Sequence, residues 1–391
     1  MKKDKMKKEN KKQVILIATG GTGGHIFPAL SIISQQKFDR YLIITDRRGK
    51  NYFTKFLEEK NINAQMYVQK VISPSQKLII NKFISLFYFG IFFLKSIVLV
   101  IKHKPDIAIG FGGYPSISPI LAAKFFGIDT IIHEQNAVIG RANKVLSYIS
   151  NLVALSFKDT KNIRSYKNII YSGNPVRDEF YKIGKTKYEL PKNKNKLNIL
   201  IYGGSLGASF FSEYVTSIFC SMPEEIKKRI KIIQQVRKED FQKVQDKYFQ
   251  NKIECELNVF FDNIFTKFSL AHLVITRAGG STVAEIITSK KPAILVPYPN
   301  SLDNHQSENS QIIKGNGGWV FEENKNKINE LKKLIDSILK NPKKLIEANQ
   351  KLNKFSKKLD EFLNYKTPAV FLTDLLMERI LINKKGVTRA C

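Results

Sequence analysis

The sequence is poor in cysteine, and its few cysteines are widely separated. The 391 residues include only three, Cys220, Cys255 and Cys391. This spacing excludes a disulfide scaffold and a cysteine-rich zinc site, and it is typical of a protein from a reducing compartment. The content of 43% hydrophobic and 25% charged residues is that of ordinary globular proteins, so collagen-like, coiled-coil and wholly disordered chains are excluded as well.

Acidic residues are also scarce relative to basic ones. Asp and Glu number 34 against 64 Lys and Arg, which gives a formal net charge of +30. The lysines are spread along the chain and interleaved with Asn and Ile, as in residues 185–196, and they do not gather in one patch. We interpret this charge as a solvated lysine-rich surface, with attraction to an anionic membrane as the alternative. No zinc-finger, RRM or KH signature is present, so we expect no nucleic-acid partner.

Short apolar runs alternate with glycine-rich turns and helical segments along most of the chain. The runs lie at 14–19, 41–45, 105–110, 130–133, 197–202, 228–234, 273–276 and 292–297. This alternation predicts an α/β protein with two parallel sheets, each with helices on both faces. We expect the following division: a disordered basic tail at 1–12, domains at 13–179 and 197–365, a linker at 180–196 and a final helix at 366–385 that packs back on the first domain.

One apolar run is long enough to be considered as a membrane span. Residues 83–101 contain a single charge, Lys95, and lysines flank the run on both sides. The internal lysine, the interruption at Gly90 and the return of the sheet pattern at residue 105 argue against spanning. We favour a helix that packs one face on the sheet and lays the other on a membrane interface, with a buried core helix and a true span as alternatives.

Two glycine-rich turns each follow a predicted strand and precede a predicted helix. They are 20–25 (GGTGGH) and 203–207 (GGSLG). Glycine lets the backbone approach a ligand closely, and a helix N-terminus offers free N–H groups and a positive dipole end. The first turn is not the dinucleotide fingerprint, because Ile26 stands where that motif needs glycine. The two turns therefore predict one anion-binding surface in each half of the chain.

The second turn also matches G-x-S-x-G, the nucleophile elbow of hydrolases, with Ser205 as nucleophile. Asp262 or Asp303 together with His305 would have to complete the triad. This interpretation leaves the first turn without a role, so an α/β-hydrolase is kept only as an alternative.

Two further segments carry groups suited to a nucleotide. Residues 276–285 place glycines and hydroxyls ahead of a helix, with Glu285 one turn in, where a carboxylate can bind ribose hydroxyls. A plain helix capping box explains the same residues without a ligand. In the segment 174–177, Arg177 supplies a guanidinium that suits a pyrophosphate.

Six motifs, taken in order, resemble those of the MurG family, the membrane-associated N-acetylglucosaminyltransferases of peptidoglycan synthesis. They are GGTGGH, GFGGYPS, HEQN, SGNPVR, GGSxGA and the stretch from RAGGSTVAE to DNHQ, and the resemblance extends from residue 14 to about 381. It implies a GT-B fold, with two Rossmann-like domains facing a cleft. It also implies transfer of N-acetylglucosamine, with inversion, from UDP-GlcNAc to the C4 hydroxyl of MurNAc in lipid I, giving lipid II.

The resemblance further implies a peripheral enzyme at the cytoplasmic face of the inner membrane. Its expected partners are UDP-GlcNAc, lipid I and the anionic membrane surface, and other cell-wall synthesis proteins remain an open class. Another GT-B transferase with a different lipid-linked acceptor is the alternative function, because a fold alone does not fix the acceptor. A lipid-carrier-binding protein without catalysis is a third, weaker possibility.

Carried over motif by motif, the substrate-binding residues come from both halves of the chain. They are Thr22, Gly23, Gly24, Asn136, Arg177, Ser205, Phe261, Gly280, Ser281, Thr282, Val283, Ala284, Glu285 and Gln306. The resemblance implies that 280–285 hold uridine and ribose, that Gln306 holds sugar hydroxyls, and that Phe261 lies beside uracil. Leu206 replaces the usual Gln of the second turn, which puts one polar contact in question, and His305 stands where Gln is common.

Inversion needs one base on the acceptor hydroxyl and a stabilised UDP leaving group. Because this leaving group is an anionic diphosphate, helix N-termini and Arg177 can stabilise it, and we expect no metal and no other cofactor. His25 is the favoured catalytic base, because its ordinary pKa near ~6.5 suits proton abstraction at neutral pH. Glu134 of HEQN is the alternative base, and a purely hydrogen-bonding role for His25 also stays open.

Overall fold

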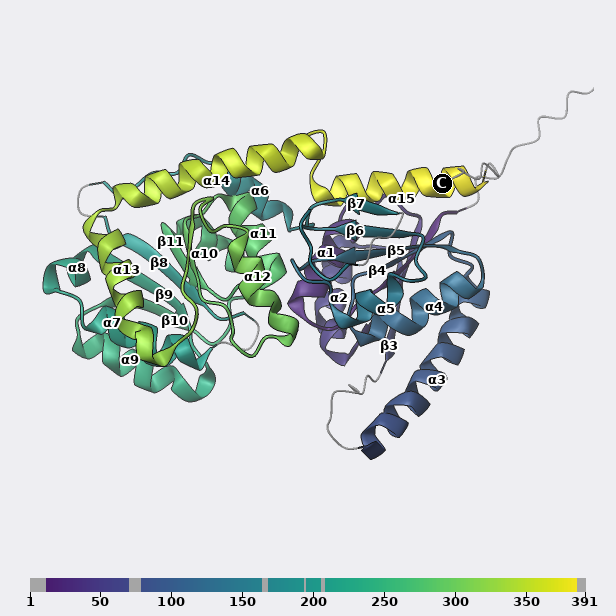
Figure 1. Ribbon diagram of the computed structural model, residues 1–391, viewed down its shortest axis with the longest axis horizontal. Helices are drawn as coiled ribbons and strands as arrows, with labels where there is room; N and C mark the ends of the chain where they lie inside the picture. The colour runs from purple at the N-terminus through teal and green to yellow at the C-terminus, as the bar shows by residue number, and fades with distance from the viewer. Residues whose placement is uncertain (1–11, 70–78, 164–167, 193–194, 205–207, 385–391) are drawn as a thin grey trace, which may run out of the picture.

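The computed structural model describes residues 12–69, 79–163, 168–192, 195–204 and 208–384, and all statements on structure below refer to these. The chain forms two parallel β-sheets, of seven and six strands, in two lobes that lie side by side (Figure 1). We call the part around the first sheet the N-terminal lobe and the part around the second sheet the C-terminal lobe. The predicted α/β class with two parallel sheets is confirmed.

The N-terminal lobe has the strand order β3-β2-β1-β4-β5-β6-β7. Its strands are β1 Val14–Ala18, β2 Arg40–Asp46, β3 Ala64–Gln69, β4 Ile107–Gly110, β5 Asp129–Glu134, β6 Leu152–Leu155 and β7 Ile169–Tyr171. Its helices are α1 Gly23–Ile33, α2 Arg47–Lys60, α3 Ile79–His103, α4 Ile117–Phe125 and α5 Arg141–Leu146, with a 3₁₀ turn at Tyr114–Ser116.

The C-terminal lobe has the strand order β10-β9-β8-β11-β12-β13. Its strands are β8 Leu197–Tyr202, β9 Ile230–Gln235, β10 Glu254–Asn258, β11 Leu273–Thr276, β12 Ala293–Leu295 and β13 Gly318–Val320. Its helices are α6 Asp178–Lys185, α7 Thr216–Cys220, α8 Glu224–Arg229, α9 Phe241–Gln250, α10 Ile264–Leu270, α11 Gly280–Ser289, α12 His305–Gln311, α13 Ile328–Lys340 and α14 Lys343–Phe362. Short helical turns occur at Phe211–Val215, Lys238–Asp240, Leu302–Asn304 and Lys325–Lys327.

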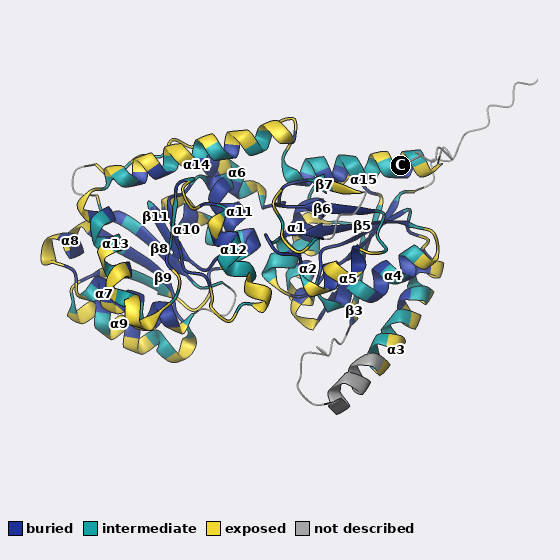
Figure 2. Cartoon of the chain, in the orientation of Figure 1, coloured by how far each residue is buried: buried dark blue, intermediate teal, exposed yellow. Residues whose placement is uncertain are grey.

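Each sheet is covered on both faces, as its sequence requires. In β1, Ile15 and Ile17 belong to one hydrophobic core, whereas Leu16 and Ala18 belong to another on the opposite face. Strands buried on both faces read as continuous apolar runs, which is why β1 and β8 were visible in the sequence. Figure 2 shows the consequence, with dark blue strands at the centre of each lobe.

The expected linker at 180–196 begins inside a packed helix. Phe180 and Ile183 of α6 are buried in the core of the C-terminal lobe, and the Phe180 ring lies edge-on to Phe268 at 5.0 Å between centroids. Two apolar residues three positions apart lie on one helix face. Their signal was hidden by the lysines that surround them in the sequence.

The last helix, α15 (Pro368–Lys384), lies along the N-terminal lobe, whereas α14 lies along the C-terminal lobe (Figure 1). Its apolar stripe enters the core of the first sheet through Ala369, Leu372, Leu376 and Ile380. Arg379 anchors the far end, because its Nε and Nη2 donate to the two carboxylate oxygens of Asp129 at 2.5 and 2.8 Å. The chain therefore returns to the lobe in which it began.

Helix α3 is half packed and half exposed. Ser96 and Val100 are buried, whereas Phe87, Leu94, Val98 and Ile101 are more than half exposed, at 68%, 63%, 61% and 53%. No helix within the described ranges has the combination of length and apolarity that crossing a membrane requires.

We predict that Arg379→Ala destabilises the chain by about 1–3 kcal/mol, because it leaves the buried Asp129 carboxylate without its two-pronged partner. Arg379→Lys keeps the positive charge but supplies a single ammonium group, so this variant should lose less stability than Arg379→Ala. The free energy of unfolding from urea titration measures both. Identical stabilities of wild type and Arg379→Ala would contradict the anchoring role.

Candidate functional site

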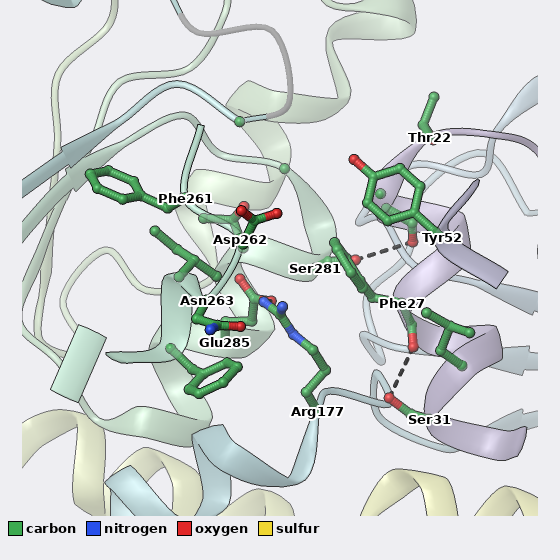
Figure 3. Close-up of a pocket in the computed structure, with 18 of the residues that line it drawn as sticks. Thr22, Phe27, Ser31, Tyr52, Arg177, Phe261, Asp262, Asn263, Ser281 and Glu285 are labelled. Carbon is green, nitrogen blue, oxygen red and sulfur yellow. Dashed lines mark hydrogen bonds and ion pairs between the residues drawn. The ribbon is translucent and has the colours of Figure 1, made fainter. Parts of the chain in front are cut away.

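The carboxyl ends of both sheets open onto one cavity of about 1020 Å³. In each sheet the strand order reverses between the first and fourth strands, β1 and β4 or β8 and β11, and ligands of such sheets bind at this point. Helices α1 and α2 line the cavity from the N-terminal lobe, and the loop before α10 together with α11 lines it from the C-terminal lobe (Figure 3).

Two helix N-termini from different lobes meet in this cavity. Helix α1 begins at Gly23 and α11 at Gly280, and the Ser281 hydroxyl donates to the backbone carbonyl of Gly24 at 3.1 Å. The first turns of both helices carry backbone N–H groups without an intrahelical acceptor, and both dipoles place their positive ends here. The cavity is therefore suited to an anion such as a diphosphate.

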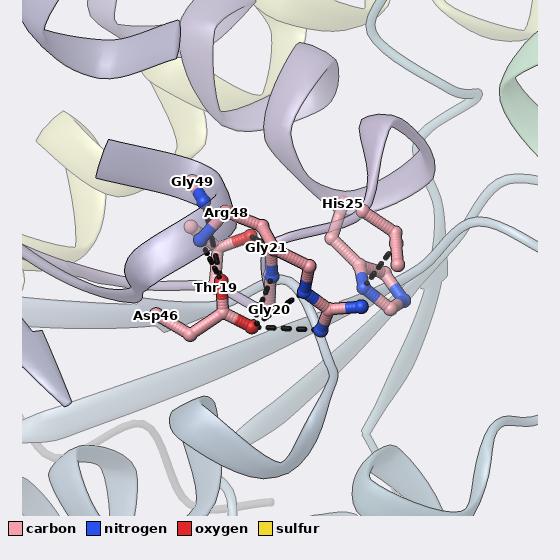
Figure 4. A network of polar contacts seen from close by, with 8 residues as sticks. Thr19, Gly20, Gly21, His25, Asp46, Arg48 and Gly49 are labelled. Atoms are coloured by element: carbon pink, nitrogen blue, oxygen red, sulfur yellow. Dashed lines mark hydrogen bonds and ion pairs between the residues drawn. The ribbon is translucent and has the colours of Figure 1, made fainter. Parts of the chain in front are cut away.

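The first glycine turn is held from below by Asp46, a residue that the sequence analysis did not single out (Figure 4). Its Oδ2 accepts from the Gly21 backbone at 3.2 Å, and its Oδ1 accepts from the backbone N–H groups of Arg48 and Gly49 at the start of α2. A Cβ on Gly21 would lie 1.7 Å from Asp46 Oδ1, so the turn needs glycine there. An Asp at the end of an apolar run, just before a helix, was the available signal.

His25 stands in the first turn of α1, at the edge of the cavity and outside its lining. Its Nδ1 lies 3.1 Å from the Thr22 hydroxyl. The glycines of two loops make room for the imidazole, since a Cβ on Gly20 would lie 3.0 Å from Nδ1 and one on Gly112 3.4 Å from Nε2. Burial and the charge of Arg48 lower the pKa of His25 to about 4. The ring is therefore neutral at physiological pH, but it is a weaker base than the ordinary imidazole that the sequence analysis assumed.

The carboxylate of Glu134, the alternative base, already accepts hydrogen bonds from the loop in which Glu134 lies. Its buried carboxylate accepts from the backbone and side chain of Asn136, both at 3.0 Å, from the Gly140 backbone at 2.9 Å and from the Asn143 amide at 2.8 Å. Four donors fill the acceptor sites of a carboxylate. Glu134 therefore orders the loop after β5, and neither Glu134 nor His25 belongs to the cavity lining, so the choice between the two bases stays a prediction.

Arg177 and Glu285 lie together in the cavity (Figure 3). Arg177 Nη2 donates to Glu285 Oε1 at 3.1 Å, and the guanidinium lies 4.4 Å from the centroid of the Phe27 ring. Burial raises the pKa of Glu285, and the neighbouring Arg177 opposes this shift. The cation expected at the pyrophosphate and the carboxylate expected at the ribose are thus brought to one place.

Gln306 is fixed with a defined orientation. Its Oε1 accepts from the backbone N–H groups of Tyr298, at 3.0 Å, and Ala278, at 3.3 Å. Because these partners are both donors, the amide oxygen is identified and Nε2 remains as the donor side. Gln306 lines the cavity, as a residue that binds sugar hydroxyls must.

The remaining expected site residues divide into four groups. The cavity lining includes Thr22, Gly23, Gly24, Phe261, Gly280, Ser281 and Thr282. Val283 and Ala284 are buried in the core of the C-terminal lobe. Asn136 lies between the lobes, where its Oδ1 accepts from the Asn309 amide at 3.0 Å. Ser205 and Leu206 lie outside the described residues.

Two neighbours of the site were missed by the sequence analysis. Tyr52 packs edge-on against Phe27, with 5.9 Å between ring centroids, and both line the cavity from the N-terminal lobe. Arg48 also lines it and pairs with Asp46 at 2.7 Å. Their helix α2 carries no sequence motif, so only the fold brings it to the cavity.

Comparison with known proteins agrees with this architecture. Residues 15–155 match the glycosyltransferase family 28 N-terminal domain, and residues 198–362 match the glycosyltransferase family 28 C-terminal domain. The crystal structure of Acinetobacter baumannii MurG has a TM-score of 0.69 at 24% identity, covering 94% of this chain and 99% of that one. A UDP-glucosyltransferase from Polygonum tinctorium has a TM-score of 0.67 at 11% identity, and the match covers 95% of this chain and 98% of that one. Fold and site define a glycosyltransferase of the GT-B class, as predicted.

Two curated relatives show to which family of glycosyltransferases the chain belongs. The protein of Wolbachia pipientis subsp. Culex pipiens (strain wPip) is 37% identical over 352 residues, 89% of this chain and 97% of the relative. The protein of Agrobacterium fabrum is 35% identical over 337 residues, which cover 85% of this chain and 88% of the relative. Both are named UDP-N-acetylglucosamine--N-acetylmuramyl-(pentapeptide) pyrophosphoryl-undecaprenol N-acetylglucosamine transferase. The chain belongs to this family, the MurG family, which the six motifs predicted; an α/β-hydrolase is excluded.

We predict that the His25 imidazole titrates near pH 4, well below the ordinary value of 6.5, because it is desolvated and faces Arg48. Arg48→Gln should raise the midpoint, since it removes a positive charge and leaves Asp46 unneutralised. NMR of the ring Cε1 proton, assigned by its loss in His25→Gln, gives the midpoint. The neighbouring Arg47→Gln serves as the matched control, and a wild-type midpoint near 6.5 would contradict the burial argument.

Proposed function

We propose that the chain transfers N-acetylglucosamine from UDP-GlcNAc to the C4 hydroxyl of MurNAc in lipid I, forming lipid II with inversion at the transferred sugar. The observation that carries this proposal is the meeting of the N-termini of α1 and α11 in one cavity with Arg177, Glu285 and Gln306. These groups match the parts of the donor: a diphosphate, a ribose and a sugar. The family relatives carry the same activity in their names.

The donor lies along α11 in this proposal. The backbone N–H groups at Gly280 and Ser281 face the diphosphate, and Glu285 accepts from the ribose hydroxyls. Arg177 Nη2 donates to Glu285, and the guanidinium has further N–H groups that can donate to a phosphate oxygen. Gln306 Nε2 donates to a hydroxyl of the sugar.

The acceptor lies on the side of α1, next to His25. When Nδ1–H donates to the Thr22 hydroxyl, Nε2 carries the free lone pair. Nε2 takes the proton of the C4 hydroxyl of the acceptor. At the same time, the hydroxyl oxygen bonds to the anomeric carbon of the donor sugar, from the face opposite UDP. The bond from that carbon to the diphosphate oxygen breaks, and UDP leaves with the electron pair, stabilised by the two helix N-termini. A base whose pKa lies well below 7 is weak, so transfer to His25 requires a hydroxyl whose proton has become more acidic as its oxygen bonds to the anomeric carbon.

We also propose that the chain binds the cytoplasmic face of the inner membrane as a peripheral protein. The exposed stripe of α3, formed by Phe87, Leu94, Val98 and Ile101, lies on one helix face, and Phe125 and Phe126 at the end of neighbouring α4 are exposed too. An apolar stripe of this kind, with lysines nearby, fits an interfacial helix. Lipid I is held in the membrane by its polyprenyl chain, so an enzyme that acts on it must reach that surface.

The activity is tested with purified protein, radiolabelled UDP-GlcNAc and a short-chain lipid I analogue in the presence of EDTA. We expect labelled lipid II, because the leaving group is stabilised by protein groups. His25→Ala should lower kcat by about 10²–10⁴-fold with UDP affinity unchanged. If His25→Ala retains turnover while Glu134→Gln loses it, the base is Glu134. Activity that is lost in EDTA and restored by magnesium would refute the metal-free mechanism.

Membrane binding is tested with vesicles of anionic and of neutral lipid. We expect binding to anionic vesicles that weakens with salt, since each nearby lysine contributes on the order of 1 kcal/mol. Leu94→Ser with Val98→Ser should release the protein while UDP affinity stays unchanged. Phe249→Ser removes an even more exposed apolar side chain from the C-terminal lobe and is the control. Equal binding to both vesicle types would contradict the electrostatic contribution.

A further inference from the structure

An ion pair joins the turn that precedes α12 to the opposite lobe. Arg141, the first residue of α5 in the N-terminal lobe, donates from Nε and Nη2 to the two carboxylate oxygens of Asp303, both at 3.1 Å. A two-pronged contact of this kind fixes direction as well as distance. Asp303 belongs to the C-terminal lobe and stands three residues before Gln306.

The turn is in a conformation that needs support. Asp303 and Asn304 follow each other with φ of +52° and +56°, in the left-handed region that residues other than glycine rarely adopt. Asp and Asn tolerate this region better than most residues, but two in succession persist only where the surroundings hold them. Within the turn, the Asn304 backbone donates to the Ser301 carbonyl at 3.1 Å. From outside, Arg141 holds Asp303.

The shape of this turn determines where Gln306 stands. The Gln306 backbone N–H lies 3.4 Å from the Ser301 hydroxyl, at the other end of the same turn. Its side chain is fixed by the backbone of Tyr298, just before the turn, and of Ala278. Because Gln306 follows the turn by two residues, a change of φ at Asp303 or Asn304 would move its backbone and pull the carboxamide away from these two donors.

The rest of α12 is attached to the N-terminal lobe independently. Lys161 pairs with Glu308 at 2.7 Å, and the Asn309 Oδ1 accepts from the Ala137 backbone at 2.7 Å. Asn309 is fully buried, whereas Arg141 and Asp303 are partly exposed. Removing Arg141 should thus release the turn and the first residues of α12, His305 and Gln306, and leave the rest of the helix in place.

We propose that Arg141 is a positioning residue for donor-sugar recognition: from the opposite lobe, it holds the Asp303–Asn304 turn in the form that aims Gln306 at the sugar of UDP-GlcNAc. The proposal rests on the proposed function, because it takes Gln306 as the ligand of that sugar. Arg141 does not itself line the cavity. Sugar recognition in the C-terminal lobe therefore depends on the N-terminal lobe being in contact with it.

The test compares UDP-GlcNAc with UDP, which lacks the sugar, by calorimetry. Arg141→Ala should weaken UDP-GlcNAc binding about fivefold, a loss of the size that an exposed ion pair accounts for, and leave UDP binding unchanged. KM for UDP-GlcNAc should rise more than kcat falls. Asp303→Asn should weaken UDP-GlcNAc binding to the same extent. The double variant, Arg141→Ala with Asp303→Asn, should bind UDP-GlcNAc no more weakly than either single variant. Lys340→Ala, which removes an exposed pair with Asp336 on α13, is the control.

Charge exchange strengthens the test. Arg141→Asp combined with Asp303→Arg should recover part of the UDP-GlcNAc affinity that either change alone removes. Equal losses for UDP and UDP-GlcNAc, additive losses in the double variant, or unchanged binding in Arg141→Ala would each overturn the proposal. Failure of the wild type to prefer UDP-GlcNAc over UDP-glucose would instead count against the proposed function.

Discussion

Ser281 of α11 donates a hydrogen bond to the carbonyl of Gly24 in α1, and through this contact two helix N-termini from different lobes face each other. Two positive dipole ends repel when they are brought together, so a short bridge is needed to hold them. Gly280 lets the start of α11 lie close to the loop after β5 of the opposite lobe, since a Cβ on Gly280 would lie 2.2 Å from the Gln135 carbonyl. The field that results favours a negative charge between the lobes before any ligand arrives.

The polar residues around this contact act mainly by holding one another. Asp46 fixes the first glycine turn, Glu134 fixes the loop after β5, and that loop reaches across to Asn309 through Asn136. Arg177 and Gln306, by contrast, belong to the cavity lining. Such an arrangement places the catalytic geometry on strand ends and helix starts, which move little.

Sequence reasoning located the inner strands, with the exception of β6, and missed most of the edge strands. β3, β7, β10 and β13 are the outermost strands of their sheets, and each is short or rich in polar residues because one side has no neighbouring strand. The glycine turns were found because the glycines that form each turn are close together in the sequence. Val283 and Ala284 were assigned to the site by motif alone, and the helical repeat turns their side chains into the core. Asp46 and Arg48 were missed because their role depends on contacts between distant segments.

The return of the chain through α15 limits how the lobes can move. The polypeptide crosses between them twice, once near Gly173 and again between Leu363 and Pro368, and these crossings touch: a Cβ on Gly173 would lie 2.8 Å from the Pro368 ring. Gly173, Asn364 and Tyr365 all have positive φ, so both crossings turn sharply at this point. Two adjacent links act as a pivot with a single axis. The lobes can open and close like the covers of a book, whereas sliding or twisting past each other would strain both links.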